Sequence, residues 1–196
     1  MKINPSLYAF RPGQHGDAHF LLSTWLKSYR NSAFAQRISN DVYFRGHQEQ
    51  IATILGIEGT AVTVVCAKDD EDQILGYVVY NTLVPILHYA YVKYPFRNVG
   101  LGSLLIKMVG ALHPGQALNC THLAKQWDSV SRKFNLLYNP YYLGVVIGQR
   151  NEGGNQPADS VSRQGAEVVS EQLPGAGGVH PGQEPLEGDE VYATGG

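Results

Sequence analysis

The chain has 196 residues, a formal net charge of −2 and 43% hydrophobic residues. This length favours a single core, and the near-neutral balance of charge disfavours a general affinity for nucleic acid or membrane surfaces. No apolar run approaches the roughly 20 residues of a membrane-spanning helix, and the N-terminus lacks the apolar stretch of a signal peptide, so we expect neither a span nor export.

The first half of the chain is predicted to hold a strand, two helices and a hairpin. A short apolar run at 7–10 ends at a Pro-Gly break and predicts the strand, after which Asp17 is placed to cap a helix. A second helix is expected over 42–55. The β-branched run 61–67 and the run 74–80, joined by an acidic turn, predict the two strands of a hairpin.

The second half is predicted to alternate strands and helices. A strand over 86–93 leads through a glycine loop into a helix with apolar residues at spacings of three and four. A short strand over 118–123, a helix capped by Asp128 that runs through Leu137, and a last strand over 141–147 follow. The central strand, helix and strand form a βαβ unit, whose strands should be parallel. The order indicates a mixed α/β arrangement around one sheet.

The composition changes near Gly148. From 149 to 196 the chain is dominated by Gly, Pro, Glu, Gln and Ser, with only scattered Val and Leu. Such a segment cannot bury enough apolar surface to offset the entropy lost on ordering. We therefore predict a folded domain over 1–148 and a disordered tail over 149–196. The tail either only solvates the protein or serves as a tether or docking segment.

The most informative segment is the loop 97–102, RNVGLG, which follows a strand ending near Val92. Free N–H groups at a helix start attract anions, and glycines let the backbone approach a phosphate closely. Arg97 adds a permanent positive charge. No Lys follows Gly102, as a Walker A loop requires, and Leu105 stands where a dinucleotide loop needs a small residue. The loop therefore predicts a different pyrophosphate site, with a simple glycine turn as the alternative.

The pattern Arg-x-x-Gly-x-Gly after a strand ending in Val resembles the acetyl-CoA loop of the GNAT superfamily of N-acetyltransferases. The segments 10–12 and 17–18 are similar to the family's opening, and 136–138 is similar to the end of its fourth helix. The resemblance spans most of residues 7–143 and implies the GNAT fold, a mixed and mostly antiparallel sheet flanked by helices. The family has two more strands after that helix, whereas this sequence offers one. The chain also resembles small GNAT-like proteins encoded by bacteriophages.

The resemblance implies contacts with acetyl-CoA as cosubstrate. In the family, the strand before the loop splays from its neighbour and the pantetheine arm occupies the gap, so the N–H of Val92 would polarise the thioester carbonyl. Backbone N–H groups of the loop would hold the pyrophosphate, and Ser131 occupies a position where the family often has a pantetheine-binding Asn. The implied cofactor-binding residues are Tyr91, Val92, Lys93, Arg97, Asn98, Val99, Gly100, Leu101, Gly102, Ser103 and Ser131.

The resemblance also implies direct attack of an amine on the acetyl thioester, which needs a base and an acid. Tyr138 matches the family tyrosine that serves as general acid; a core or interface tyrosine is the alternative. We single out His88 as the base because it lies four residues before Val92, on the same strand face, and titrates near neutral pH. A hydrogen-bonded strand histidine is the alternative. The segment 88–102 also resembles arylalkylamine N-acetyltransferase, whose second histidine is replaced here by Ile86.

Two classes of function follow from these features. The first is an N-acetyltransferase acting on a small-molecule amine, a protein lysine or an N-terminus. The second is a catalytically inactive GNAT-like binding or assembly protein, which should fill the cleft beside Val92 with side chains such as Tyr91, Tyr94 or Phe96. A protein partner or a homodimer is open in either case, and neither nucleic acid nor a membrane is expected as a partner.

The two cysteines predict core residues rather than chemistry. Cys66 and Cys120 each lie in an apolar stretch, without a nearby Cys or His at metal-ligand spacing. We therefore expect no disulfide framework and no metal site. This cysteine usage fits a reducing compartment, and we expect the protein to be cytoplasmic.

Overall fold

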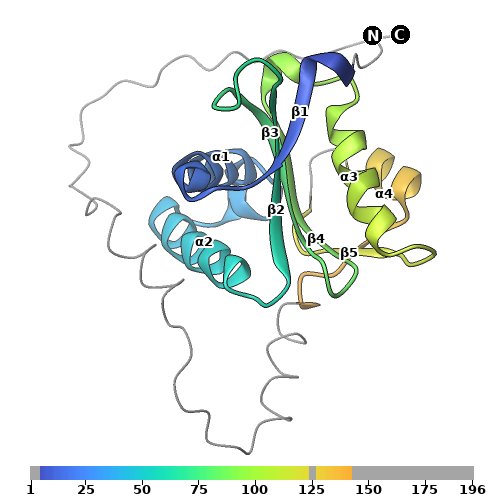
Figure 1. The fold of residues 1–196 in the computed structure, drawn as a ribbon. Coiled ribbons are helices and arrows are strands. Elements are labelled where there is room, and N and C mark those ends of the chain that lie inside the picture. Colours follow the sequence, from blue (N-terminus) through green and yellow to red (C-terminus); the bar gives the residue numbers. More distant parts are fainter. Residues whose placement is uncertain (1–4, 124–126, 143–196) are drawn as a thin grey trace, which may run out of the picture. The chain divides into compact units, whose positions relative to one another are not determined.

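The computed structural model describes residues 5–123 and 127–142, and within them six strands form one sheet (Figure 1). The strands are β1 (Tyr8–Pro12), β2 (Thr60–Ala67), β3 (Ile74–Asn81), β4 (Ile86–Val92), β5 (Leu118–Cys120) and β6 (Leu136–Tyr138). The main helices are α1 (Ala18–Arg30), α2 (Asn40–Leu55), α3 (Leu101–Leu112) and α4 (Trp127–Phe134). All of these elements lie in one unit, Met1–Val161, and the predicted domain boundary near Gly148 falls outside the described residues.

The strands follow one another across the sheet in chain order. β1 to β4 pair antiparallel, and β5 is parallel to β4 and β6 is parallel to β5. The predicted fold class, a mixed and mostly antiparallel sheet flanked by helices, is therefore confirmed. The parallel pair of β4 and β5 also confirms the predicted βαβ unit around α3, because parallel neighbours need a crossover connection.

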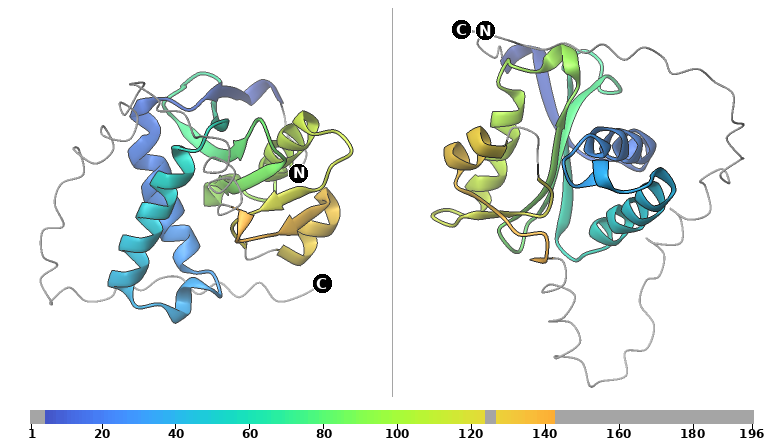
Figure 2. Two further views of the ribbon diagram at one scale, coloured as in Figure 1. Left: turned by 90° about the horizontal axis from the view of Figure 1, so that it is seen from below. Right: turned by 180° about the vertical axis from the view of Figure 1, so that it is seen from behind.

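Helices cover both faces of the sheet (Figure 2). α1 and α2 pack on one face over a cluster that includes Trp25, Ile51 and Tyr77, and α3 and α4 pack on the other over a cluster that includes Leu105 and Val109. β3 lies in the middle and is buried along almost its whole length. Two covered faces explain why this strand is a nearly continuous apolar run rather than an alternating one.

The turn between β1 and α1 is held by an ion pair. Asp17 directly precedes α1, as predicted, but its carboxylate makes no capping hydrogen bond to the helix. It accepts instead from the guanidinium of Arg11 at 2.6 Å and from the N–H of Gln14 at 2.8 Å. The hydrogen bond from Arg11 lowers the pKa of Asp17. Asp17 therefore links the start of α1 to β1 and does not cap the first turn of α1.

The C-terminal part of the described chain differs from the sequence prediction. The helix expected to run through Leu137 ends at Phe134, because Asn135 adopts a left-handed backbone with φ 52°. The segment Leu136–Tyr138 is not a helix end but strand β6, and Leu136 is buried against the α3 side of the core. Pairing with β5 has overridden the helical pattern.

Two further expectations at this end are corrected. Asp128 lies inside the first turn of α4, which begins at Trp127, and so does not precede the helix. Tyr141 lies in a turn, where the N–H of Tyr142 donates to the carbonyl of Asn139 at 3.3 Å. The strand predicted over 141–147 thus does not begin there, and its remaining residues fall outside the described ones. Among the described helices, none has the length and apolar character needed to cross a bilayer.

Candidate active site

The strands β4 and β5 separate after a short ladder. β5 pairs with β4 only at Ile86 and Leu87, which face Asn119 and Cys120. β4 continues to Val92, whereas β5 ends at Cys120. Within the described residues, the second part of β4 therefore has no strand partner on this side. The GNAT resemblance implied a pantetheine arm beside this part of β4, and that contact stays a prediction.

Val92 presents its backbone toward the unpaired side of β4. The N–H of Lys93 donates to the carbonyl of Leu75 in β3 at 2.8 Å. Neighbouring residues of a strand point their backbone groups in opposite directions, so the N–H and C=O of Val92 turn away from β3. The carbonyl of Val92 accepts a hydrogen bond from Nε of Arg97 at 2.9 Å. Arg97 therefore ties the loop to the strand end as well as supplying charge.

The start of α3 is an uncapped helix N-terminus. Gly100 is the N-cap residue, with φ 100° and ψ 0°, a left-handed conformation that glycine adopts without strain. No side chain caps the helix and its first turn holds no acidic residue. The N–H groups of Leu101, Gly102 and Ser103 precede the first helical hydrogen bond, from Leu104 to Gly100, and so have no acceptor within the helix. They form a site for an anion.

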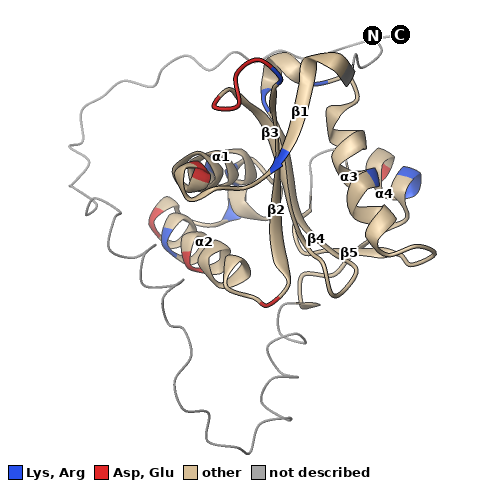
Figure 3. Cartoon of the chain, viewed as in Figure 1, with Lys and Arg blue, Asp and Glu red and all other residues tan. Residues whose placement is uncertain are grey.

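A second cation approaches this site from α4. Nζ of Lys133 lies 3.4 Å from Oγ of Ser103, in the first turn of α3. Figure 3 marks basic residues on α4, which also carries Asp128, whereas acidic residues gather in the turn between β2 and β3. Sequence reasoning missed Lys133, because no local pattern indicates that α4 packs beside the start of α3. Ser131, the predicted pantetheine contact, is half-buried on the same helix.

His88 occupies a β-bulge. Val79 pairs with Tyr89 and Tyr80 pairs with Leu87, so His88 is an extra residue in β4. The bulge interrupts the two-residue alternation, and it is Leu87 that packs in the same cluster as Val92. Simple alternation therefore cannot be carried from Val92 to His88, and the face on which His88 lies stays a prediction.

The side chain of His88 is buried rather than open to solvent. It is 1% exposed, and its Nδ1 lies 3.2 Å from Oγ1 of Thr121. Burial lowers the pKa of His88 to about 4, so the ring is neutral at pH 7. Its role as a base stays a prediction, and any such role has to pass through Thr121 or through Nε2 of the ring.

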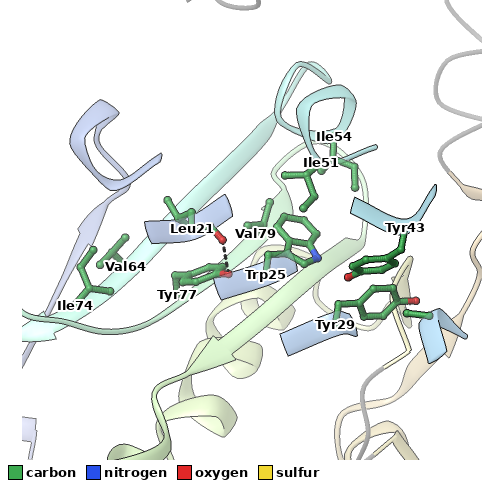
Figure 4. Close-up of a cluster of buried hydrophobic side chains, with 11 residues drawn as sticks. Leu21, Trp25, Tyr29, Tyr43, Ile51, Ile54, Val64, Ile74, Tyr77 and Val79 are labelled. Atoms are coloured by element: carbon green, nitrogen blue, oxygen red, sulfur yellow. Dashed lines mark hydrogen bonds between the residues drawn. The ribbon is translucent and has the colours of Figure 1, made fainter. Parts of the chain in front are cut away.

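Two histidines that the sequence did not single out lie close to this bulge. His122 directly follows Thr121, whose Oγ1 is 2.9 Å from its Nδ1, and its ring centroid is 5.2 Å from that of His47. Burial lowers the pKa of both rings. Both rings pack against Trp25 and Tyr29 of α1, two residues that Figure 4 shows within the core cluster. No spacing in the sequence relates His47, His88 and His122, so only the fold brings them together.

Tyr138 lies at the end of β6, paired with Cys120 of β5. Its side chain is 39% exposed and packs edge-on against Trp127, with ring centroids 5.9 Å apart. Partial burial, with a smaller contribution from Tyr141, raises the pKa of Tyr138, so the hydroxyl keeps its proton at neutral pH. The carboxyl ends of the parallel strands β5 and β6 thus place Tyr138 at the same sheet edge as Thr121. Its role as an acid stays a prediction.

The three rings that the sequence suggested as fillers of the cleft have different surroundings. Tyr91 packs against Tyr77 and Phe20 on the α1 side, with centroids 5.5 and 6.2 Å away. Phe96 packs with the cluster on the α3 side, and Tyr94 is 73% exposed. Two of these three rings are therefore parts of the packed core.

Cys66 and Cys120 are free and buried, and burial raises the pKa of both thiols. They behave as small core residues, as expected. Among residues 5–123 and 127–142, no group of three or more His, Cys, Asp or Glu side chains is arranged to hold a metal ion.

Comparisons with known proteins give structural matches only. No protein-family model and no curated protein matches this sequence. The apo form of YjaB from Escherichia coli is 16% identical with a TM-score of 0.41, and the match covers 54% of this chain and 66% of YjaB, just under two thirds. A GCN5-related N-acetyltransferase from Rhodopseudomonas palustris is 16% identical with a TM-score of 0.41 and coverages of 57% and 69%.

An N-acetyltransferase from Staphylococcus aureus is 16% identical with a TM-score of 0.40, and the match covers 65% of this chain and 82% of that one. The matching structures include acetyltransferases of the GNAT family, the family that the sequence resembles. Because each of these three TM-scores is below 0.5, the roles of individual residues rest on the geometry of this chain alone.

Proposed function

We propose that this chain is a GNAT-type N-acyltransferase that transfers an acetyl group from acetyl-CoA to a primary amine of a small molecule, a protein lysine or an N-terminus. One observation carries the proposal: an uncapped helix N-terminus follows a strand whose outer backbone edge lacks a partner strand among the described residues. The first feature suits a pyrophosphate and the second suits an extended amide-containing arm.

The residues present fit this cosubstrate. A pyrophosphate needs N–H donors and positive charge, and the start of α3 offers both, with Arg97 and Lys133 beside it. A pantetheine arm carries amide groups that pair with strand backbone, and Val92 turns its N–H and C=O toward the open side of β4. Acetyl-CoA, when bound, supplies the thioester that the amine attacks.

The residues of this chain then have separate roles in the reaction. The backbone N–H groups of the α3 start hold the phosphates, and the N–H of Val92 polarises the thioester carbonyl. Tyr138 is protonated at neutral pH and suits the donation of a proton to the leaving sulfur.

The first experiment is calorimetric titration with acetyl-CoA of the wild type, of Gly100→Asp and of Gly115→Asp. Gly115 is a matched control, because it also has a left-handed backbone, with φ 75°, but lies beyond the other end of α3. Both variants introduce the same side chain and comparable backbone strain. Only Gly100→Asp places a carboxylate at the proposed phosphate site.

We expect saturable binding by the wild type and by Gly115→Asp, and an affinity about tenfold lower or worse for Gly100→Asp. Binding should be followed by acetyl transfer to members of an amine panel, with kcat lowered in Tyr138→Phe. If the folded wild type binds no acetyl-CoA, the proposed function is wrong.

A further inference from the structure

A continuous hydrogen-bonded chain crosses the point where β4 and β5 separate. Oγ1 of Thr121 lies 3.2 Å from Nδ1 of His88 and 2.9 Å from Nδ1 of His122. His88 is the bulged residue of β4, and Thr121 and His122 follow β5 directly. One hydroxyl thus bridges two imidazole rings from two strands, at the end of their shared ladder.

The two outer nitrogens of this chain lack hydrogen-bond partners. Nε2 of His88 and Nε2 of His122 are both buried and unpaired within the part of the chain that the structure describes. The two side chains are only 1% and 6% exposed. A buried polar atom without a partner is costly, and such atoms often mark a functional site. The chain therefore ends, on each side, in a buried ring nitrogen that has no partner among the described residues.

Elementary hydrogen bonding leaves the chain two directions. The hydroxyl of Thr121 has one proton, so it can donate to one Nδ1 while it accepts from the other. In one of these arrangements Nδ1 of His122 donates to Thr121 and Thr121 donates to Nδ1 of His88. In that arrangement His122 carries its proton on Nδ1 and His88 carries its proton on Nε2.

We propose that His88, Thr121 and His122 form a proton relay, with His122 as the base that accepts the proton of the acceptor amine. The part about the amine rests on the proposed function. The ammonium nitrogen gives one proton to Nε2 of His122 and becomes a neutral nucleophile. The Nδ1 proton of His122 passes to Thr121, the hydroxyl proton of Thr121 passes to Nδ1 of His88, and the Nε2 proton of His88 leaves to water. One proton enters and one leaves, and the chain ends in the opposite tautomers until it relaxes.

The residues around His122 do not stabilise a protonated imidazole. The titratable groups that contact His122 are His47 from α2, Tyr29 from α1 and Tyr89 from β4, and Tyr138 from β6 interacts with Tyr29. Among the described residues, none of these contacts supplies a carboxylate that would hold a second positive charge. Protonation at either end is therefore short-lived, which suits a relay that transfers the proton onward.

The first test reads the tautomers directly, by long-range ¹H–¹⁵N NMR of the full-length protein at pH 7.5. We expect His122 to carry its proton on Nδ1 and His88 on Nε2. In Thr121→Val, which keeps the shape but removes the hydroxyl, both Nδ1 signals should shift, whereas Thr121→Ser should keep the wild-type pattern. Thr60→Val is the control, since its hydroxyl is also buried but unpaired among the described residues. Identical tautomers for both histidines, or no response to Thr121→Val, would overturn the relay.

The second test needs an amine that the wild type acetylates. Loss of the relay should lower kcat roughly 10- to 100-fold in Thr121→Val and leave KM for acetyl-CoA unchanged. The dependence of kcat on pH should become flatter in this variant. Thr121→Ser should recover the wild-type kcat. Wild-type kcat in Thr121→Val would overturn the role of His122 as the base. If the wild type binds no acetyl-CoA, the proposed function fails, while the tautomer measurement still decides whether the relay exists.

Discussion

At the scale of single residues, the site depends on groups that different elements bring together. Arg97 joins the loop to the strand, since its Nε donates to the carbonyl of Val92 and its guanidinium lies over the ring of Tyr94. Lys133 reaches the same helix start from α4. The side chain of His88 is exposed by only 1% and contacts Thr121, so in the proposed relay it acts through Thr121. The proposal thus assigns binding to the loop residues and proton transfer to the residues where β4 and β5 separate.

Lys133→Ala should weaken the binding of acetyl-CoA roughly three- to tenfold, because an exposed cation beside a phosphate contributes modestly and is screened by salt. The measurement is calorimetry at low and at high ionic strength, with a larger effect expected at low ionic strength. Lys107→Ala is the control, since Lys107 is exposed on the later part of α3. Equal losses in both variants would mean that Lys133 supplies only general positive charge.

At the scale of elements, the packing of α1 and α2 on the sheet is rich in aromatic and histidine rings. Trp25 stacks on Tyr89 of β4 with centroids 4.8 Å apart, and the hydroxyl of Tyr77 donates to the carbonyl of Leu21 in α1 (Figure 4). His47 is stacked on both Tyr29 and Tyr43. The interface thus buries several neutral histidines between helices and sheet, and its stability depends on their staying neutral.

Stability should therefore fall as the pH drops from about 6.5 to about 4. Burial lowers the pKa of His88 to about 4 from its ordinary 6.5, so in this window the unfolded chain binds a proton that the folded protein excludes. His88 alone should lower the free energy of unfolding by about 3 kcal/mol across the window, and the lowered pKa values of His47 and His122 act in the same direction. Above about pH 6.5 these rings have no effect, since both states are neutral.

Urea unfolding at pH 7.5, 6 and 5 measures this effect. The chosen range lies above the ordinary pKa of Asp17, whose lowered pKa reduces stability only in more acid solution. His88→Gln should reduce the dependence on pH, and the exposed His15→Gln should leave it unchanged. The same free energy of unfolding at pH 5 and at pH 7.5 would contradict the assignment of buried neutral histidines.

At the scale of the whole molecule, one sheet with helices on both faces builds the site at the edge where β4, β5 and β6 end. These strands are parallel, so their carboxyl ends meet at one edge, and the crossover helices bring the α3 start and Lys133 to the same region. The core of the described part, in two clusters on either side of the sheet, uses residues from Leu21 to Leu136. The contacts on which the site is built all join residues of the described ranges.

We accordingly expect a protein that ends at Gly148 to keep the stability and the acetyl-CoA affinity of the full chain. The segment 149–196 has the composition of a tail and too few apolar residues for a core. Thermal unfolding followed by circular dichroism, together with calorimetric titration, compares the two proteins. A midpoint several degrees lower in the shortened protein would show that the segment after 148 supports the fold, and would overturn the predicted domain boundary.

The sequence by itself determined the order and type of most elements and the position of the phosphate loop. Apolar spacing, β-branched runs and glycines are local signals, so the helices α1 to α3, the hairpin of β2 and β3, and the loop before α3 followed from them. The same signals failed at Leu136–Tyr138, where pairing with β5 outweighed the helical pattern. They also could not reveal that a bulge interrupts the alternation at His88, because a bulge leaves no mark in the sequence.

Only the tertiary structure decided which side chains meet. Ser103 and Lys133 are joined across two helices, and His88 and Thr121 across two strands. The separation of β4 from β5 is likewise a property of pairing, not of either strand alone. Such contacts join residues far apart in the chain, and no local pattern of polarity or spacing records them. For that reason the sequence could suggest a phosphate loop, whereas the residues of the proposed proton relay could be named only from the fold.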